Sequence, residues 1–157
     1  MENIRAEILR TDDPDFISAR IVIGADSEKI FELLARPESH SLFDGSGTVQ
    51  GSLSGPKRLS LGAKFGMSMK IKIPYRISNT VVEFEEGRLI SWCHLMKWKW
   101  SYELVDLGNG QIQVTESFDA RDIPKVAAWW FHKTTSTRRN ATWMAKSLVK
   151  LKLISES

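Results

Sequence analysis

The sequence predicts an α+β fold in which a curved antiparallel sheet of six or seven strands wraps around a long C-terminal helix, with short helices after the first strand. Two observations carry this prediction. The middle of the chain alternates apolar and polar residues, the period of two that is typical of half-buried strands. The last part changes to apolar spacings of three and four, which are typical of an amphipathic helix. A curved sheet that faces one long helix often leaves a cavity between them.

The composition predicts one domain over residues 1–157, because 42% hydrophobic residues, six Trp and seven Phe can form a substantial core. Residues 1–13 are expected to be a flexible or edge segment. The lone Cys93 cannot form an internal disulfide, which favours a reducing compartment. No segment has the roughly 18 apolar residues of a membrane-spanning helix, and the first residues lack the apolar core of a signal peptide. We therefore expect a soluble, cytoplasmic protein.

The first strand and the helix after it are expected near the N-terminus. Residues Phe16 to Ile23 alternate apolar and polar side chains, which predicts a strand. Asp26 is suited to cap a following helix, whose apolar stripe ends before Pro37. Residues 44–62 are rich in Gly and Ser, so we expect a mobile rim there, with only a short strand around residues 48–53.

The remaining strands are expected in the middle of the chain. The cleanest alternation lies in residues 63–73, where every odd position is apolar. The next strand, residues 75–86, changes its apolar parity midway, which predicts a bulge near Asn79. Three further strands are expected at residues 89–96, 97–105 and 111–119, with turns at residues 86–88 and 106–110.

The final segment is predicted to be one continuous helix that begins near Asp122 and Pro124. At about 1.5 Å per residue it would extend roughly 45 Å, long enough to cross the concave face of the sheet. Its stripe, in steps of three and four, consists of Val126, Trp130, Thr134, Thr137, Ala141, Met144, Leu148 and Leu151.

Positive charge is concentrated in this last segment. The chain has a formal net charge of +3, but residues 121–157 hold eight Lys/Arg against two acidic residues, a net +6, while the remainder is −3. A basic helix can attract phosphates or anionic lipid. The same charges can instead form the solvated side of a helix whose other face is buried, and both interpretations stay open.

Several short segments mark strand turns and core aromatic positions: Leu61-Gly62, GRLISWCHL (87–95), KWSYEL (99–104), a glycine hairpin and VTESFD (114–119). In these segments, and in the order of its elements over nearly the whole chain, the sequence resembles the polyketide cyclase/dehydrase-like branch of the START/Bet v 1 (SRPBCC) superfamily. The resemblance implies a helix-grip fold with a pocket. Similar proteins include lipid and sterol carriers, hormone receptors and aromatase/cyclases, so no single reaction is implied. The chain lacks the Gly loop of the plant allergen branch and the Cys/His iron-cluster signature of the ring-hydroxylating branch.

Glu116 is the strongest candidate for a catalytic residue. It shares a strand face with Val114 and Phe118, where a carboxylate is costly unless it is paired or hydrogen-bonded. His94 and Tyr102, on nearby predicted strands, are the candidate partners. In an apolar pocket the pKa of Glu116 would be raised, and the carboxyl could act as general acid or base on a bound carbonyl compound, with His94 as the second catalytic candidate. The alternative is a structural pair inside the sheet.

The predicted interior is rich in aromatic and thioether side chains, which suit planar or apolar ligands. Small residues in the middle of the final helix would leave volume for a ligand, or would let the helix lie close to the sheet. The candidate ligand-binding residues are Met67, Met69, Asn79, Trp98, Trp100, Tyr102, Phe118, Trp130, Thr134 and Thr137.

The sequence predicts no metal and no other cofactor. His40, His94 and His132 do not have the spacing of metal ligands. No nucleophile elbow, Walker loop or dinucleotide-binding glycine pattern occurs.

The leading hypothesis is that the protein binds a hydrophobic or aromatic small molecule, lipid-like or polyketide-like, between the sheet and the C-terminal helix. One alternative is an aromatase/cyclase-type enzyme that uses Glu116 or His94 for acid–base chemistry. A second alternative is a non-catalytic interaction module, in which the basic C-terminal helix meets a protein, RNA or an anionic membrane. Under the leading hypothesis nucleic acid is not an expected partner, a peripheral membrane contact stays open, and no oligomeric state is predicted.

Overall fold

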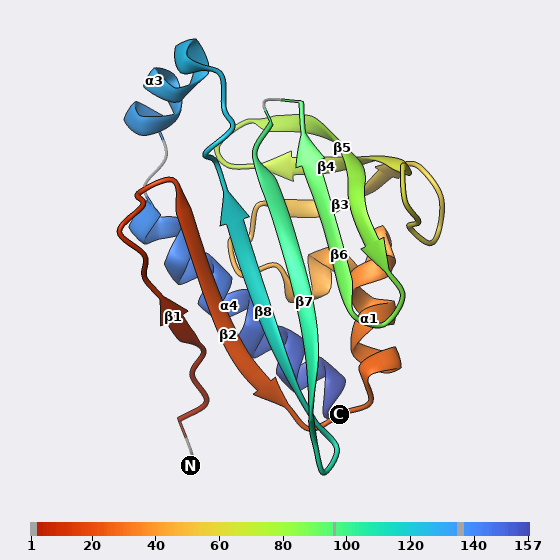
Figure 1. Cartoon of the computed structure of the whole chain (residues 1–157). Coiled ribbons are helices and arrows are strands. Elements are labelled where there is room, and N and C mark those ends of the chain that lie inside the picture. Colours follow the sequence, from red (N-terminus) through yellow and green to blue (C-terminus); the bar gives the residue numbers. More distant parts are fainter. Residues whose placement is uncertain (1–2, 96, 135–136) are drawn as a thin grey trace.

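The computed structural model describes residues 3–95, 97–134 and 137–157, and the side chains of residues 130–138 lie outside this description. Within these ranges the chain forms an eight-stranded antiparallel sheet in the order β1-β2-β8-β7-β6-β5-β4-β3, with helix α4 across one face (Figure 1). The strands are β1 (Glu7–Leu9), β2 (Phe16–Ile23), β3 (Val49–Ser54), β4 (Lys64–Lys70), β5 (Pro74–Glu85), β6 (Leu89–His94), β7 (Lys99–Gly108) and β8 (Gln111–Asp119). The helical segments are α1 (Ser27–Ala35), the 3-10 helix η1 (Pro37–Ser39), α2 (His40–Phe43), α3 (Lys125–Thr134) and α4 (Thr137–Ser155).

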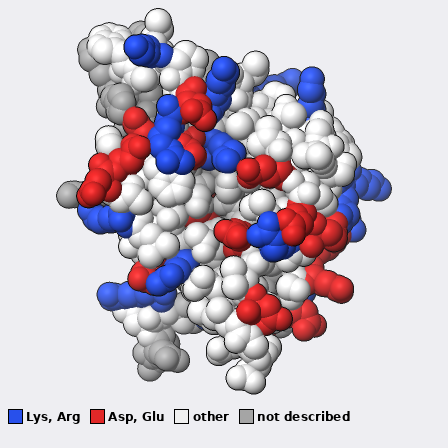
Figure 2. Space-filling view, in the orientation of Figure 1, with Lys and Arg blue, Asp and Glu red and all other residues white. Residues whose placement is uncertain are grey.

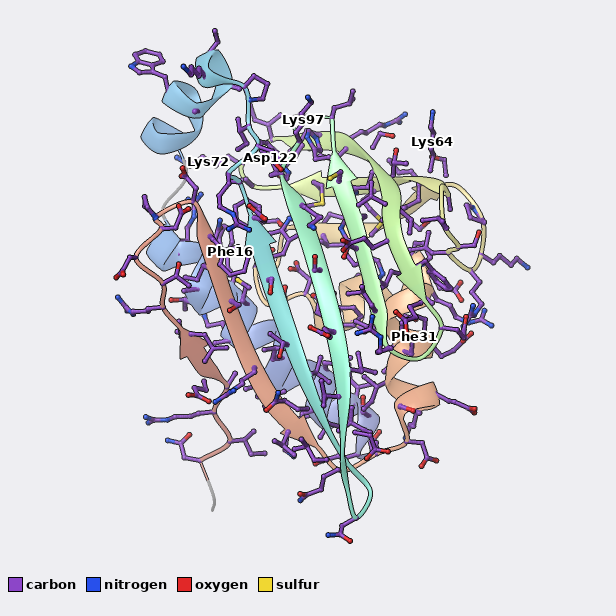
Figure 3. The ribbon with its side chains drawn as sticks, in the orientation of Figure 1. Phe16, Phe31, Lys64, Lys72, Lys97 and Asp122 are labelled. Carbon is purple, nitrogen blue, oxygen red and sulfur yellow. The ribbon has the colours of Figure 1, made fainter. Side chains whose placement is uncertain are left out.

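The core lies between the sheet and the helices that cover it. Every odd-numbered residue of β2 is buried, as the alternation predicts, and α4 contributes Met144, Leu148 and Leu151 to the same layer. At the other end of the sheet, the ring of Phe31 in α1 meets the ring of Phe84 edge-on, with 5.5 Å between centroids; Figure 3 shows where Phe31 lies. The predicted α+β fold, a curved sheet that grips a C-terminal helix, is confirmed.

The sheet has one strand more than the upper limit of the prediction. β1 forms its edge, because Glu7 to Leu9 pair with β2 in the register Glu7↔Arg20 to Leu9↔Ser18. An exposed ion pair, Arg20 Nε to Glu7 Oε2 at 2.7 Å, links the two strands. Three residues are too few for a period of two to be recognised, so the sequence predicted no strand here but only a flexible or edge segment over residues 1–13.

The C-terminal segment, predicted to be one continuous helix, is described as two helices, and residues 135–136 between them lie outside the described residues. α3 ends at Thr134 and α4 begins at Thr137, and Figure 1 shows α3 projecting away from the sheet. The side chains of Trp130, Thr134 and Thr137, predicted to bind ligand, lie outside the described residues. Of the described helices, none is long and apolar enough to cross a membrane.

The bulge in β5 lies further along the strand than predicted. The β5–β6 register shifts between Val81 and Glu83, whereas Asn79 pairs regularly with His94. Asn79 and Val81 therefore face inward, and Val82 is 41% exposed. The change of apolar parity along the sequence shows that β5 contains one bulged residue. It does not show which residue is bulged, because the position of the bulge depends on the cross-strand hydrogen bonds.

The start of the Gly- and Ser-rich segment, predicted as a mobile rim, is fastened to α4. The backbone N–H of Gly45 donates to Ser147 Oγ at 2.8 Å, and Lys150 Nζ donates to the carbonyl of Asp44 at 2.9 Å. A Cβ at Gly45 would lie 2.3 Å from the carbonyl oxygen of Trp143, so only glycine permits this close approach. The loop is therefore held against the middle of α4.

Gly45→Ala is expected to lower the free energy of unfolding by about 2 kcal/mol, because the added methyl group forces the loop away from the α4 backbone. Urea denaturation measures the loss. Gly24→Ala is the matched control, since its nearest neighbour would be the flexible Glu156 side chain at 3.4 Å, and it should cost much less. Equal losses in the two variants would show that the loop does not depend on this close approach.

Candidate functional site

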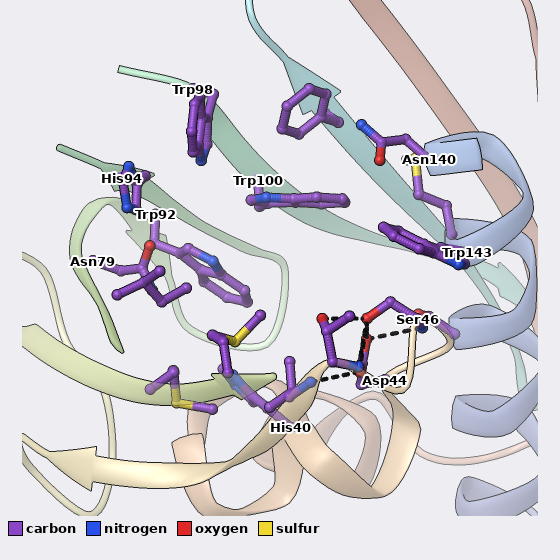
Figure 4. Close-up of a pocket in the computed structure, with 18 of the residues that line it drawn as sticks. His40, Asp44, Ser46, Asn79, Trp92, His94, Trp98, Trp100, Asn140 and Trp143 are labelled. Carbon is purple, nitrogen blue, oxygen red and sulfur yellow. Dashed lines mark hydrogen bonds between the residues drawn. The ribbon is translucent and has the colours of Figure 1, made fainter. Parts of the chain in front are cut away.

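A cavity of about 570 Å³ lies between α4 and the inner face of the sheet (Figure 4). Strands β4 to β8 supply one wall, and α2, the loop after it and α4 supply the other. The volume falls within the range of pockets that hold drug-sized molecules. The cavity exists because the inward residues of the strands and the buried stripe of α4 enclose it without filling it.

The walls of the cavity are largely aromatic. Cross-strand pairing places Trp92 opposite Trp100 and Trp100 opposite Phe118, so these rings form one row across β6, β7 and β8. The Trp100 and Phe118 rings are 4.7 Å apart between centroids. From the helical side Trp143 of α4 faces this row, and Figure 4 shows Trp100 and Trp143 approaching the cavity from opposite sides. The two indole side chains thus reach toward each other from the sheet and from α4.

Among the residues predicted to bind ligand, those in the sheet and Trp98, which immediately precedes β7, lie in the cavity wall. They are Met67, Met69, Asn79, Trp98, Trp100, Tyr102 and Phe118. Met67 is buried, and Trp98 stacks on His94 with 4.6 Å between ring centroids. The inward parity of strands β4, β5, β7 and β8 is what brings these side chains together.

Glu116 lies directly across from Tyr102 on the β7–β8 pair and is only 3% exposed. Burial raises the pKa of Glu116 to about 8, while a hydrogen bond from the Tyr102 hydroxyl lowers it and the charge of Asp44 raises it further. Among the described residues, Oε2 of Glu116 has no hydrogen-bond partner. At neutral pH the carboxyl is therefore largely protonated, and one oxygen is free to bind a ligand.

The structure brings Glu116 to Tyr102 but not to His94. His94 lies at the end of β6, in register with Asn79, and stacks on Trp98. Burial lowers the pKa of His94. His94 lines the same cavity, at a distance along it from the Glu116–Tyr102 row. An acid–base pair of Glu116 and His94 is therefore not formed.

Two buried amides line the cavity from opposite walls. Asn79 on β5 is 4% exposed and Asn140 on α4 is 5% exposed (Figure 4). Within the described part of the chain, neither side chain has a hydrogen-bond partner. Sequence reasoning named Asn79 but missed Asn140. The spacing of Asn140 could have identified it as a cavity residue. Asn140 precedes Trp143, Met144 and Ser147 by three, four and seven residues, so it lies on the same face of the helix.

His40, at the start of α2, lines the cavity and packs behind Trp92. From the sequence it was considered only as a metal ligand. Its Nε2 donates to the carbonyl of Leu34 at 2.8 Å, and its ring stacks on Trp92 with 5.1 Å between centroids. Burial lowers the pKa of His40 to about 4, so the imidazole is neutral at physiological pH. A contact between residues 40 and 92 is tertiary and has no local pattern in the sequence.

Besides Glu116, the cavity is lined by the carboxylate of Asp44 and the guanidinium groups of Arg76 and Arg139, which are either hydrogen-bonded or exposed at its rim. The carboxylate of Asp44 accepts hydrogen bonds from Ser46 Oγ at 2.7 Å and from the backbone N–H of Val49 at 3.0 Å. Arg76 and Arg139 are exposed, and the guanidinium of Arg139 lies 4.6 Å from the ring centroid of Trp143. Within the described residues, no group of His, Cys, Asp and Glu could hold a metal ion.

Comparison with known proteins supports the fold more strongly than any activity. No family model matches the sequence. The uncharacterized protein Rv0088 of Mycobacterium tuberculosis is 32% identical over 141 residues, which cover 88% of this chain but 63% of that protein. The chain thus spans less than two thirds of the length of this curated relative.

Two solved structures have the same arrangement over nearly their whole length. Protein Ms6760 of Mycobacterium smegmatis has a TM-score of 0.69 at 9% identity, covering 96% of this chain and 97% of its own. The Polyketide_cyc-like protein Cgl2372 of Corynebacterium glutamicum has a TM-score of 0.61 at 18% identity, covering 92% of this chain and 93% of its own. At these identities the similarity shows the fold alone.

Proposed function

We propose that the chain, which has the helix-grip fold of the Polyketide_cyc-like protein Cgl2372, binds a hydrophobic or aromatic small molecule in the cavity between its sheet and α4. The observation that carries the proposal is the aromatic-walled cavity of about 570 Å³. Buried apolar ligand surface contributes roughly 25 cal/mol per Å², which would supply most of the affinity. A cytoplasmic location is part of the same proposal.

Native mass spectrometry of the purified protein, before and after mild organic extraction, tests this proposal directly. A lipid-like or polyketide-like molecule that leaves on extraction would identify the ligand class. Titration calorimetry with 2-ethylnaphthalene, an apolar two-ring probe, tests the cavity independently of co-purification. A protein that carries no extractable molecule and gives no heat with the probe would contradict the proposal.

Trp100→Ala is expected to weaken the binding of 2-ethylnaphthalene by about tenfold or more, because the variant removes the central ring of the aromatic row. Titration calorimetry measures the change. Trp129→Ala is the matched control, since Trp129 is 55% exposed on α3 and does not line the cavity, and its affinity should equal that of the wild type. Equal weakening in both variants would place the probe outside the cavity.

An aromatase/cyclase-type enzyme is the second candidate, and the state of Glu116 favours it. A carboxyl whose pKa is raised to about 8, with one unpartnered oxygen in an apolar cavity, has the properties of a general acid or base. Tyr102 rather than His94 would be its neighbour in such a reaction. Glu116→Gln should then abolish turnover of a bound polyketide-like substrate while leaving its affinity nearly unchanged.

The interaction module that uses the basic helix receives less support. Lys150 donates to the carbonyl of Asp44, and Lys152 donates to the carbonyl of Val22 and to Glu156, so part of the positive charge is engaged within the protein. On the face that Figure 2 shows, Lys and Arg are interspersed with Asp and Glu. A strong dependence of partner binding on salt would be the mark of this alternative.

A further inference from the structure

Three polar side chains in the cavity wall have hydrogen-bonding capacity that the described part of the protein does not use. They are the amides of Asn79 and Asn140 and Oε2 of Glu116, and all three residues are more than nine-tenths buried. They come from β5, α4 and β8, so they surround the space rather than cluster at one point. Because buried polar groups in native proteins are nearly always paired, these positions indicate a ligand with matching polar atoms.

A pure hydrocarbon is expected to bind this wall less tightly than a compound with polar atoms. It would remove the three groups from water and give them no partner, which costs free energy at each one. The ligand therefore carries oxygen or nitrogen atoms on its buried part, in addition to its apolar surface.

An anionic group does not fit the interior either. The cationic residues that line the described cavity, Arg76 and Arg139, are exposed at its rim, and the buried imidazole of His40 is neutral. The interior instead holds the carboxyls of Asp44 and Glu116. A buried charge without an opposite partner is strongly unfavourable, so a fatty-acid carboxylate cannot be the buried end of the ligand.

The walls are shaped for flat rings. Trp100 and Trp143 approach from opposite sides, and Trp92 lies beside Trp100 in the cross-strand row (Figure 4). Indole rings contact a planar molecule with large rigid surfaces and lose little side-chain freedom when they do so. A fused-ring compound uses these walls more fully than a flexible chain.

Given the proposed function, on which this step rests, we propose that the ligand is an uncharged, oxygenated fused-ring compound. A carbonyl or hydroxyl oxygen of the ligand accepts a hydrogen bond from the carboxyl of Glu116, and the amides of Asn79 and Asn140 bind further oxygens. The protonated carboxyl has the free oxygen that this requires, since the hydroxyl of Tyr102 occupies the other side of the group.

Three probes of equal ring size test the inference: the ketone 2-acetylnaphthalene, the hydrocarbon 2-ethylnaphthalene and the anion 2-naphthoate. Titration calorimetry at pH 6.5 on the wild-type protein should show the ketone binding about tenfold more tightly than the other two, the value of one hydrogen bond. Glu116→Gln keeps a donor and should keep the ketone preference. Glu116→Met has no donor and should lose that preference while still binding the hydrocarbon.

The outcomes separate this inference from the proposed function. If the hydrocarbon or the anion binds at least as tightly as the ketone, the inference is wrong and the ligand-binding function stands. If none of the three probes binds, the proposed function fails, and the inference fails with it. Should Glu116→Met not fold, as judged by circular dichroism, Asn140→Leu replaces it, with 2,6-diacetylnaphthalene as the probe for a second oxygen. An unchanged affinity in that variant would also overturn the inference.

Discussion

Glu116→Gln is expected to remove most of the pH dependence of stability between pH 6.5 and about 8. Burial raises the pKa of Glu116 from 4.5 to about 8, so the folded protein holds a proton that the unfolded chain releases throughout this range. The stability that this proton supplies is fully present below pH 4.5 and is lost as the pH rises through about 8. The free energy of unfolding of the wild type should therefore fall by about 1.4 kcal/mol for each unit of pH.

His40 gives the opposite dependence at lower pH. The pKa of His40 is lowered from 6.5 to about 4 in the folded protein. Between these two pH values the imidazole is therefore protonated in the unfolded chain and neutral in the folded protein. Stability is lost here as the pH falls. Between pH 4.5 and 6.5 the slopes of Glu116 and His40 have opposite signs and should nearly cancel, which predicts a near-plateau in the wild type, tilted toward lower stability in acid by the lowered pKa of His94. In Glu116→Gln the plateau should become a steady loss toward acid.

Urea denaturation at pH 5, 6.5, 8 and 9 measures both slopes, and the amide variant should be the more stable protein at pH 9. Glu103→Gln removes an exposed carboxylate from the same strand pair and controls for the change of net charge. A wild-type protein whose stability rises between pH 6.5 and 8 would contradict the protonated state of Glu116, and with it the hydrogen bond that the carboxyl is proposed to donate.

The inward position of Glu116 could be predicted because the segment VTESFD has a period of two that leaves only one face for it. Its partner could not be chosen in the same way. β7 lies between β6 and β8, and the row that contains Glu116 runs through Tyr102 to Ile90, not to His94. Register between strands is set by turns and bulges, and shifting it by one residue changes every neighbour.

The helical side of the site was harder to predict than the sheet. The stripe of α4 from Ala141 to Leu151 has the expected spacing and is buried. The same spacing continues through Thr134 and Thr137, the last residue of α3 and the first residue of α4. Apolar spacing reports which face of a helix is covered, but whether two stretches belong to one helix depends on packing, and α3 projects away from the sheet (Figure 1).

His40→Ala is expected to lower the free energy of unfolding at pH 7 by about 3 kcal/mol. The imidazole is 7% exposed and touches the rings of Phe43, Phe65 and Trp92, so its removal leaves a cavity among them. The variant also leaves the carbonyl of Leu34 without its donor. Affinity for 2-ethylnaphthalene should fall as well, because the wall that Trp92 forms loses the ring stacked behind it.

His40→Phe separates the two causes. Phenylalanine keeps a ring against Trp92 and removes only the hydrogen bond to Leu34, so it should cost about 1 to 2 kcal/mol and should leave probe affinity close to that of the wild type. Urea denaturation and titration calorimetry give the two numbers for each variant. If phenylalanine and alanine are equally destabilising, the hydrogen bond at the end of α1 is the dominant interaction of His40, and the ring does not support the cavity wall.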